Sequence, residues 1–121
     1  MKRGIIVDDA AIMRMRLREI LEPDYEIVAE ADNGEEAIDL CQKWHPDFVT
    51  LDISMPRTNG MDALKSLRGS SPDTKVIMVS AVGQKRLVID ALQMGASDFV
   101  IKPFEPERVR VAIGRIFDGA E

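Results

Sequence analysis

Three aspartates are the residues of this sequence best placed to do chemistry together. Asp8 and Asp9 directly follow an apolar run at residues 5–7, and Asp52 follows another at residues 48–51. Both runs are short and nearly continuous, as buried strands of a parallel sheet are. Because an open parallel sheet binds its ligands at the carboxyl ends of its strands, we expect the three carboxylates to converge there. Crowded carboxylates repel one another unless a cation joins them, and this oxygen-rich set suits Mg²⁺.

Two further polar residues end the last two apolar runs. Ser80 follows the run at residues 76–79, and Lys102 follows the run at residues 99–101. Lysine is a point charge suited to phosphoryl oxygens, and serine offers a hydroxyl. The Asp52 carboxylate could act as a nucleophile and form an aspartyl phosphate. With Mg²⁺, the lysine and the hydroxyl around it, the residues indicate a Mg²⁺-carboxylate phosphoryl site.

Each of these residues also has an ordinary structural role open to it. Asp9 could cap the first helix, and Asp52 could be a turn residue. Ser80 could be a loop hydroxyl that is hydrogen-bonded locally, and Lys102 a solvated surface charge. The prediction of a site therefore depends on the combination at the ends of four strands, and on no single member of it.

Apolar runs and segments with helical spacing alternate along the chain. The runs lie at residues 5–7, 27–29, 48–51, 76–79 and 99–101. The helical segments place apolar side chains at intervals of three and four residues: Met13, Leu17, Ile20 and Leu21; Ala37, Leu40, Cys41 and Trp44; Met61, Leu64 and Leu67; Val88, Ala91 and Leu92; Val109, Ala112, Ile113 and Ile116. This βαβαβαβαβα pattern predicts an α/β fold, in which a doubly wound five-stranded parallel sheet forms a single domain over residues 1–121.

Composition narrows the classes of function. The 121 residues include 16 basic and 21 acidic side chains, for a net charge of −5, which argues against direct binding of nucleic acid. The single cysteine, Cys41, can form no internal disulfide and suits a reducing compartment. No apolar run approaches the roughly 20 residues that span a bilayer. We therefore expect a cytoplasmic protein without membrane insertion.

At the residues named above, the sequence resembles the receiver domain of two-component response regulators over nearly its whole length. The segment IIVDD at residues 5–9 is similar to the first strand and acidic pair of that family, and DISMPRTNG at residues 52–60 to its phosphoacceptor loop, D-x-x-M-P-x-x-x-G. VSA at residues 79–81 and GASDFVIKPF at residues 95–104 resemble its switch strand and its lysine-proline signature. The resemblance implies a flavodoxin-like (βα)₅ fold with strand order 2-1-3-4-5.

The resemblance also implies roles in phosphoryl transfer. Asp52 would be the phosphoacceptor and would take the phosphoryl group from a phosphohistidine on a sensor histidine kinase. Asp9, Asp52 and the backbone carbonyl of Ser54 would hold Mg²⁺, and Asp8 would act mostly through bound water. Lys102 would pair with the phosphoryl oxygens. The protein would be no conventional enzyme, but it would catalyse its own phosphorylation and slow dephosphorylation.

Further roles implied by the resemblance concern switching and the lifetime of the phosphoryl group. Ser80 would be the switch hydroxyl, and the rotamer of Phe99 would report its movement. The bond that precedes Pro103 would be cis. Val82 and Ser54 would flank the attacking water, and because neither side chain is an acid or an amide, hydrolysis would be slow.

Several functions remain open within and outside this family. The segments at residues 80–84 and 88–91 are more similar to chemotaxis receivers than to winged-helix regulators. The sequence also stops soon after the last predicted helix, so we expect a stand-alone receiver. Its partners would be a kinase, an output protein such as the flagellar switch, and a phosphatase. The alternatives are a receiver from a DNA-binding regulator or a methylesterase, and a phosphorelay intermediate. A phosphatase of the haloacid-dehalogenase type is disfavoured, because Ala10 and Ser54 stand where its D-x-D pair needs an acid.

Overall fold

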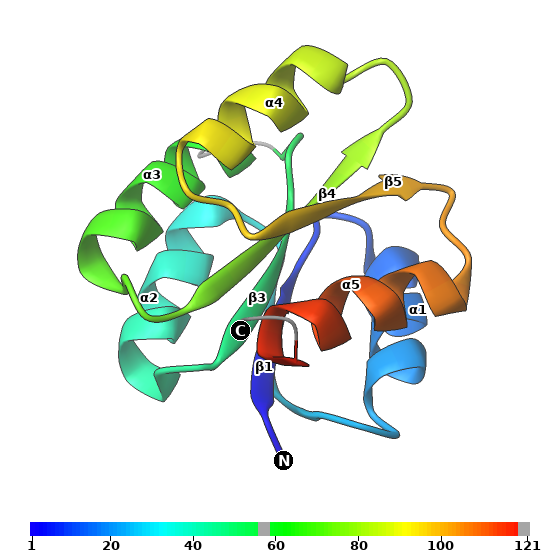
Figure 1. The fold of residues 1–121 in the computed structure, drawn as a ribbon. Coiled ribbons are helices and arrows are strands. Elements are labelled where there is room, and N and C mark those ends of the chain that lie inside the picture. Colours follow the sequence, from blue (N-terminus) through cyan, green and yellow to red (C-terminus); the bar gives the residue numbers. More distant parts are fainter. Residues whose placement is uncertain (56–58, 119–121) are drawn as a thin grey trace.

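Five parallel strands and five helices alternate along the chain, and the computed structural model describes residues 1–55 and 59–118 of it (Figure 1). The strands are β1 (Arg3–Val7), β2 (Glu26–Ala31), β3 (Phe48–Asp52), β4 (Lys75–Ala81) and β5 (Asp98–Lys102). The helices are α1 (Ala11–Leu21), α2 (Gly34–Trp44), α3 (Gly60–Ser70), α4 (Lys85–Gln93) and α5 (Pro106–Asp118). The strand order β2-β1-β3-β4-β5 confirms the predicted fold class. Residues 56–58 of the expected phosphoacceptor loop, and the final residues 119–121, lie outside the described residues.

Side chains of the central strands alternate between two hydrophobic cores. In β1, Ile5 and Val7 belong to the core beneath α2, α3 and α4, whereas Ile6 belongs to the core beneath α1 and α5. Accordingly, α2, α3 and α4 cover one face of the sheet, and α1 and α5 cover the other (Figure 1). Because both faces are covered, the inner positions of the strands are mostly apolar, which is why their sequence runs are nearly continuous rather than alternating.

Most of the predicted apolar helix faces are buried, but α4 departs from the expectation. Val88 and Ala91 pack into the core, whereas Leu92 is 40% exposed, so the prediction that Leu92 is buried is wrong. The physical reason is the place of α4 beside the edge strand β5. One flank of the helix lies over the core, while Leu92 on the next flank lines a surface groove together with Phe99 and Ile101.

The register of the strands decides which side chains meet at the carboxyl edge. Val7 of β1 pairs with Leu51 of β3, Asp52 of β3 pairs with Val79 of β4, and Ala81 of β4 pairs with Lys102 of β5. Asp8, Asp52, Ser80 and Lys102 therefore end adjacent strands at one edge of the sheet. Among the described residues, no helix is long and apolar enough to cross a membrane.

Gly60 fixes the start of α3 against the strand that carries Asp52. Its backbone N–H donates to the carbonyl oxygen of Ile53 at 2.8 Å. A Cβ atom at Gly60 would collide with the backbone carbonyl oxygen of Asp52. The close approach of α3 to the end of β3 thus requires glycine at this position. The side chain of Asn59 caps the helix by accepting from the N–H of Asp62 at 3.0 Å.

Candidate functional site

Three carboxylates lie together at the carboxyl edge of the sheet. Carboxylate oxygens of Asp8, Asp9 and Asp52 all lie within 4.8 Å of one another. Asp8 is fully buried and Asp52 is 4% exposed, whereas Asp9 is open to solvent. Asp9 does not take the helix-capping role, because Ala10 is the N-cap residue of α1 and no side chain caps it. The cluster is therefore closed on the protein side and accessible from the side of Asp9.

Lys102 places a positive charge against the two buried carboxylates. Its Nζ lies 3.0 Å from Oδ2 of Asp8 and 3.5 Å from Oδ2 of Asp52. Burial favours the neutral lysine, but the hydrogen bond that Lys102 donates to Asp8 and the charge of Asp52 outweigh it and raise the pKa of Lys102. The lysine is therefore protonated at neutral pH. The peptide bond from Lys102 to Pro103 is cis.

The carboxyl group of Asp52 is harder to ionise than an ordinary aspartate. Burial, and after it the charge of Asp8, raise the pKa of Asp52 to about 6 against the opposing effects of Lys102 and of the Ser54 N–H. That N–H donates to Oδ1 of Asp52 at 3.3 Å. One lysine thus does not offset the negative charge of three acids, and the cluster attracts a further cation.

The donor set of this edge fits Mg²⁺. Carboxylate oxygens are the ligands that this hard cation prefers, and it retains several waters when few protein ligands are available. Asp9 and Ser54 line the same surface hollow, which has a volume of about 510 Å³. A cation in contact with the carboxylates would also remove the repulsion that raises the pKa of Asp52. The residues that the sequence predicts as metal ligands are therefore suited to bind Mg²⁺.

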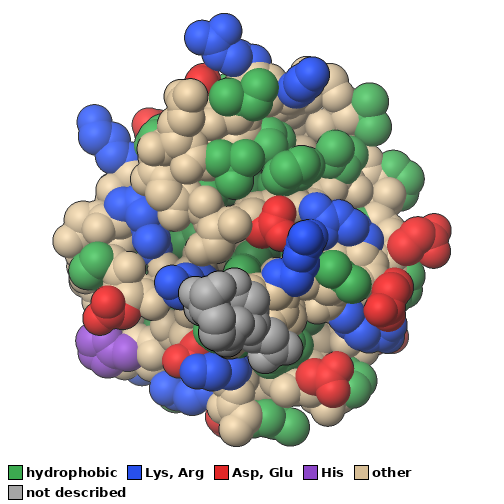
Figure 2. Space-filling view, in the orientation of Figure 1, with side chains coloured by type: hydrophobic (Ala, Val, Ile, Leu, Met, Phe, Trp, Pro, Cys, Tyr) green, Lys and Arg blue, Asp and Glu red, His purple; other side chains and the backbone are tan. Residues whose placement is uncertain are grey.

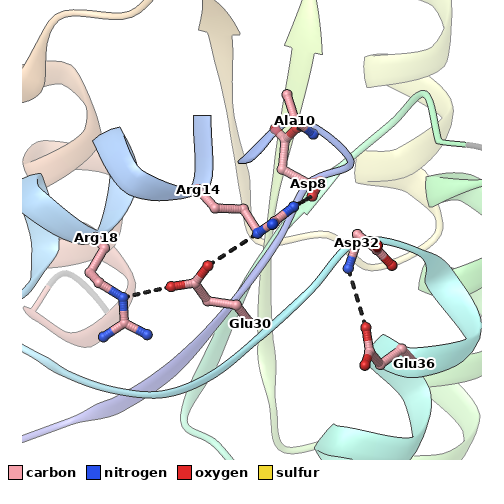
Figure 3. Close-up of polar contacts among 7 residues, drawn as sticks. All are labelled: Asp8, Ala10, Arg14, Arg18, Glu30, Asp32 and Glu36. Atoms are coloured by element: carbon pink, nitrogen blue, oxygen red, sulfur yellow. Dashed lines mark hydrogen bonds and ion pairs between the residues drawn. The ribbon is translucent and has the colours of Figure 1, made fainter. Parts of the chain in front are cut away.

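Contacts on several sides hold Asp8 in place (Figure 3). The N–H of Ala10 donates to Oδ1 of Asp8 at 2.9 Å, and Nη1 of Arg14 donates to the backbone carbonyl oxygen of Asp8 at 2.8 Å. Arg14 also pairs with Oε1 of Glu30 at 3.1 Å, while Arg18 pairs with Oε2 of the same glutamate at 2.6 Å. This network joins α1 to β2 and fixes the turn that carries the acidic pair.

The two residues expected to act in switching, Ser80 and Phe99, lie beside an apolar groove. Ser80 is 1% exposed, and its Oγ has no hydrogen-bond partner among the described residues. Ser80 and the partly buried Phe99 line a groove of about 350 Å³ between α4 and β5. Apolar side chains gather over this part of the molecule (Figure 2). Large exposed residues of the groove are Val82, Ile89, Leu92 and Ile101.

Two residues close to the site were not predicted from the sequence. Arg14 binds the backbone of Asp8, and Gln84 donates from Nε2 to Oγ of Ser54 at 2.7 Å. The spacing of Arg14 and Arg18, four residues apart, is a signal that both side chains lie on one helix face. No comparable signal exists for Gln84, because sequence spacing does not show which loop its side chain reaches.

Comparison with known proteins agrees with this geometry. The sequence model of the response regulator receiver domain matches residues 5–114. The chain belongs to this family. Over 116 residues the receiver is 47% identical to the chemotaxis protein CheY of Thermotoga maritima, and the match covers 95% of this chain and 97% of that protein.

Two other proteins help to place this receiver. A chain in the crystal structure of the CheX-CheY-BeF₃-Mg²⁺ complex from Borrelia burgdorferi has a TM-score of 0.92 at 33% identity, with 96% of this receiver and 89% of that chain covered. The protein-glutamate methylesterase/protein-glutamine glutaminase of Pyrococcus abyssi is 47% identical over 105 residues. That match covers 84% of the receiver but only 28% of the methylesterase. The receiver is therefore similar to CheY proteins along nearly their whole length, and to the methylesterase along one part.

Proposed function

We propose that this receiver is a chemotaxis response regulator that takes a phosphoryl group onto Asp52 from the phosphohistidine of a sensor histidine kinase. The observation that supports the proposal most directly is the position of Asp52. It is a buried carboxylate that faces Lys102 and lies within 4.8 Å of two further acids. The phosphoryl group would then change the affinity of the receiver for an output protein.

In the proposed reaction, a carboxylate oxygen of Asp52 attacks phosphorus while the bond from phosphorus to the donor imidazole breaks. The products are an aspartyl phosphate and a free histidine. Lys102, held by Asp8, offsets the charge on the phosphoryl oxygens. Asp9, Asp52 and the Ser54 carbonyl would hold Mg²⁺, with Asp8 acting mostly through water. The ion would supply further charge neutralisation at those oxygens.

The proposed switch begins at Ser80. Its buried hydroxyl, which has no hydrogen-bond partner among the described residues, gains a strong acceptor when a phosphoryl dianion stands on Asp52. Movement of Ser80 toward that group vacates space that Phe99 can fill by turning inward. The repacking would alter the exposed apolar surface of α4, β5 and α5, which we propose as the output face. A two-state change of this kind alters partner affinity by about 5- to 150-fold.

Labelling with acetyl phosphate tests the phosphoacceptor. Incubation with acetyl phosphate and Mg²⁺ should add one phosphoryl group by mass, and omission of Mg²⁺ should prevent it. Asp52→Asn should abolish the labelling, whereas Asp39→Asn, which changes an exposed aspartate on α2, should leave it intact. Equal labelling of Asp52→Asn and wild type would show that the phosphoacceptor is a different residue.

Amide chemical shifts test the switch. Addition of beryllofluoride and Mg²⁺, which mimic the phosphoryl group, should shift amides from residue 87 to residue 94 and that of Phe99. Ser80→Ala should greatly reduce these distant shifts, while Ser97→Ala, which changes an exposed serine, should preserve them. Shifts confined to the neighbours of Asp8, Asp9 and Asp52 would contradict the switch.

The output that we propose is control of the flagellar motor, with the flagellar switch as the partner and a phosphatase as a regulator. We also propose a cytoplasmic location, where both partners would meet the receiver. Similarity along nearly the whole of a CheY protein supports this output over that of a methylesterase or a DNA-binding regulator. Binding of beryllofluoride-loaded receiver to purified flagellar switch protein, compared with unloaded receiver, tests it. Equal affinity of the two forms would contradict it.

A further inference from the structure

Gln84 joins the two segments that flank the phosphorylation site. Its Nε2 donates to Oγ of Ser54 at 2.7 Å, and its Oε1 accepts from the backbone N–H of Ala81 at 2.6 Å. Ser54 lies two residues after Asp52, and Ala81 directly follows Ser80. A single side chain thus links the segment that follows the nucleophile to the segment that carries the switch hydroxyl.

The bridge is made by the amide group of the side chain alone. The backbone of Gln84 has other partners: its N–H donates to the carbonyl oxygen of Ala81 at 3.3 Å, and its carbonyl oxygen accepts from the N–H of Val88 at 3.0 Å. Gln84 is the N-cap residue of α4, but no side chain caps that helix. Replacing the side chain therefore removes the bridge and leaves the start of α4 with its backbone bonds.

We propose that this bridge is a latch and that Gln84 is a positioning residue for the phosphorylation switch. The Ser80 hydroxyl has no hydrogen-bond partner among the described residues, and the proposed switch moves Ser80, with the adjoining Ala81, toward a phosphoryl group on Asp52. One amide group can bond to both Ser54 Oγ and the Ala81 N–H only while the separation of these atoms is maintained. The shift therefore opens the latch, and the latch stabilises the unphosphorylated arrangement of residues 81–84.

The inference rests on the proposed function, because the latch opposes a movement that only a phosphoryl group on Asp52 would drive. It adds to that function a residue that sets the resting balance between the two arrangements. An interaction made in one of two states shifts their populations by its own free energy. Loss of the latch should therefore favour the phosphoryl-bound arrangement even before any phosphoryl group arrives.

Two single variants, the corresponding double variant and a matched control test the latch. Gln84→Met keeps the length of the side chain and removes both hydrogen bonds. Ser54→Ala removes the acceptor of one bond and keeps the backbone carbonyl of residue 54. Gln42→Met is the matched control, because Gln42 is an exposed glutamine on α2, away from the carboxyl edge of the sheet. The affinity of each variant for beryllofluoride with Mg²⁺ is measured from amide shifts during a titration.

Gln84→Met should bind beryllofluoride about 2- to 10-fold more tightly than wild type, as expected from the net worth of surface hydrogen bonds. Without the mimic, its amide shifts at Ala81 and Phe99 should already be displaced toward those of loaded wild type, a change that simple loss of stability would not produce. Ser54→Ala should show a smaller effect in the same direction. The double variant should fall short of the sum of the two, because both remove one bridge. Gln42→Met should match wild type.

The outcomes separate the latch from the function on which it rests. If wild type responds to beryllofluoride but Gln84→Met has unchanged or weaker affinity, the latch is wrong and the proposed function stands. Weaker affinity would show instead that the bridge prepares the loop for phosphorylation. If wild type does not respond to beryllofluoride at all, the proposed function and the latch are both overturned.

Discussion

The two sides of the proposed phosphorylation site are held with very different firmness. On the acidic side, Asp8 is bonded to the N–H of Ala10, to the guanidinium of Arg14 and to Nζ of Lys102. On the switch side, the hydroxyl of Ser80 has no partner among the described residues. The loop beyond it includes Val82, which is 79% exposed, and it borders an open apolar groove.

This difference matches the separate demands of transfer and switching. Group transfer is fastest when the nucleophile and its charge partners are fixed before the substrate arrives, since less order then has to be gained during the reaction. A switch needs an element with two arrangements of similar free energy, and few contacts favour that condition. We therefore propose that the acidic side serves the chemistry and that the side of Ser80 serves the response.

The largest expected effect comes from removing the positive charge of Lys102 on the firmly held side. Lys102→Met should slow labelling by acetyl phosphate about 100-fold, as loss of one group that stabilises transition-state charge typically does. It also leaves the fully buried Asp8 without its cation, so the variant should unfold at lower denaturant concentration. The rate of mass increase and a urea titration measure the two effects.

Lys75→Met, which changes an exposed lysine at the start of β4, controls for the loss of a positive charge. It should label at the wild-type rate. If Lys102→Met also labels at that rate while it remains folded, then Lys102 serves only to neutralise Asp8 and the assignment of its role in transfer is wrong.

The raised pKa of Asp52 predicts that ionisation of this group lowers the free energy of unfolding. Burial and the charge of Asp8 raise its pKa from 3.8 to about 6, so the folded state binds this proton more tightly than the unfolded state. The free energy of unfolding attributable to Asp52 therefore falls as pH rises from about 4 to about 6. Without Mg²⁺, Asp52→Asn should stabilise the protein by about 1–3 kcal/mol at pH 7.5, and the gain should vanish near pH 4.

Denaturant titrations of wild type and Asp52→Asn over this pH range measure the two free energies of unfolding. In their difference, the contributions of the acids that both proteins contain cancel. Asp39→Asn, at an exposed site, should give a difference that does not change with pH. A constant difference for Asp52→Asn as well would show that Asp52 is ionised throughout and that Lys102 compensates the repulsion fully.

The sequence was sufficient for the fold and for the members of the acidic cluster. Residues 5–7 and, apart from the buried Thr50, residues 48–51 are apolar because each strand contacts a core on both faces, and the residues after them must then lie at the ligand-binding edge. The sequence pattern of apolar runs does not show which loop a long side chain contacts. The bridge from Gln84 to Ser54 and the exposure of Leu92 both depend on where α4 lies beside β5, which only the assembled structure shows.

A smaller effect is expected where Arg14 fixes the acidic turn. Arg14→Lys keeps the charge, but an ammonium group cannot reproduce the fork that binds both the Asp8 carbonyl and Glu30. Because groups that orient metal ligands contribute to affinity, we expect about 10-fold weaker Mg²⁺ binding, measured by calorimetry. Arg16→Lys, an exposed position on the same helix, should bind Mg²⁺ as wild type does. Equal affinities for both variants would mean that the turn is fixed without Arg14.

The smallest expected effect lies on the loosely held side and concerns the lifetime of the aspartyl phosphate. The family resemblance implies that Val82 and Ser54 would flank the attacking water, and neither side chain could orient it as a base. Val82 is 79% exposed, so a polar replacement there should be accommodated without loss of stability. Val82→Glu, Val82→Gln and Ser54→Asn should each speed the loss of the phosphoryl group about 3- to 10-fold, since each places an acid or an amide beside the water.

The decay is followed by mass after acetyl phosphate has been removed from the labelled protein. Val111→Glu is the matched control, because it makes the same change at an exposed valine on α5. It should leave the decay unchanged, which separates a local effect on the water from a general effect of added negative charge. If neither position alters the decay, the firmly held groups around Asp52 alone set the lifetime. The loosely held side would then act only in the response and have no part in the chemistry.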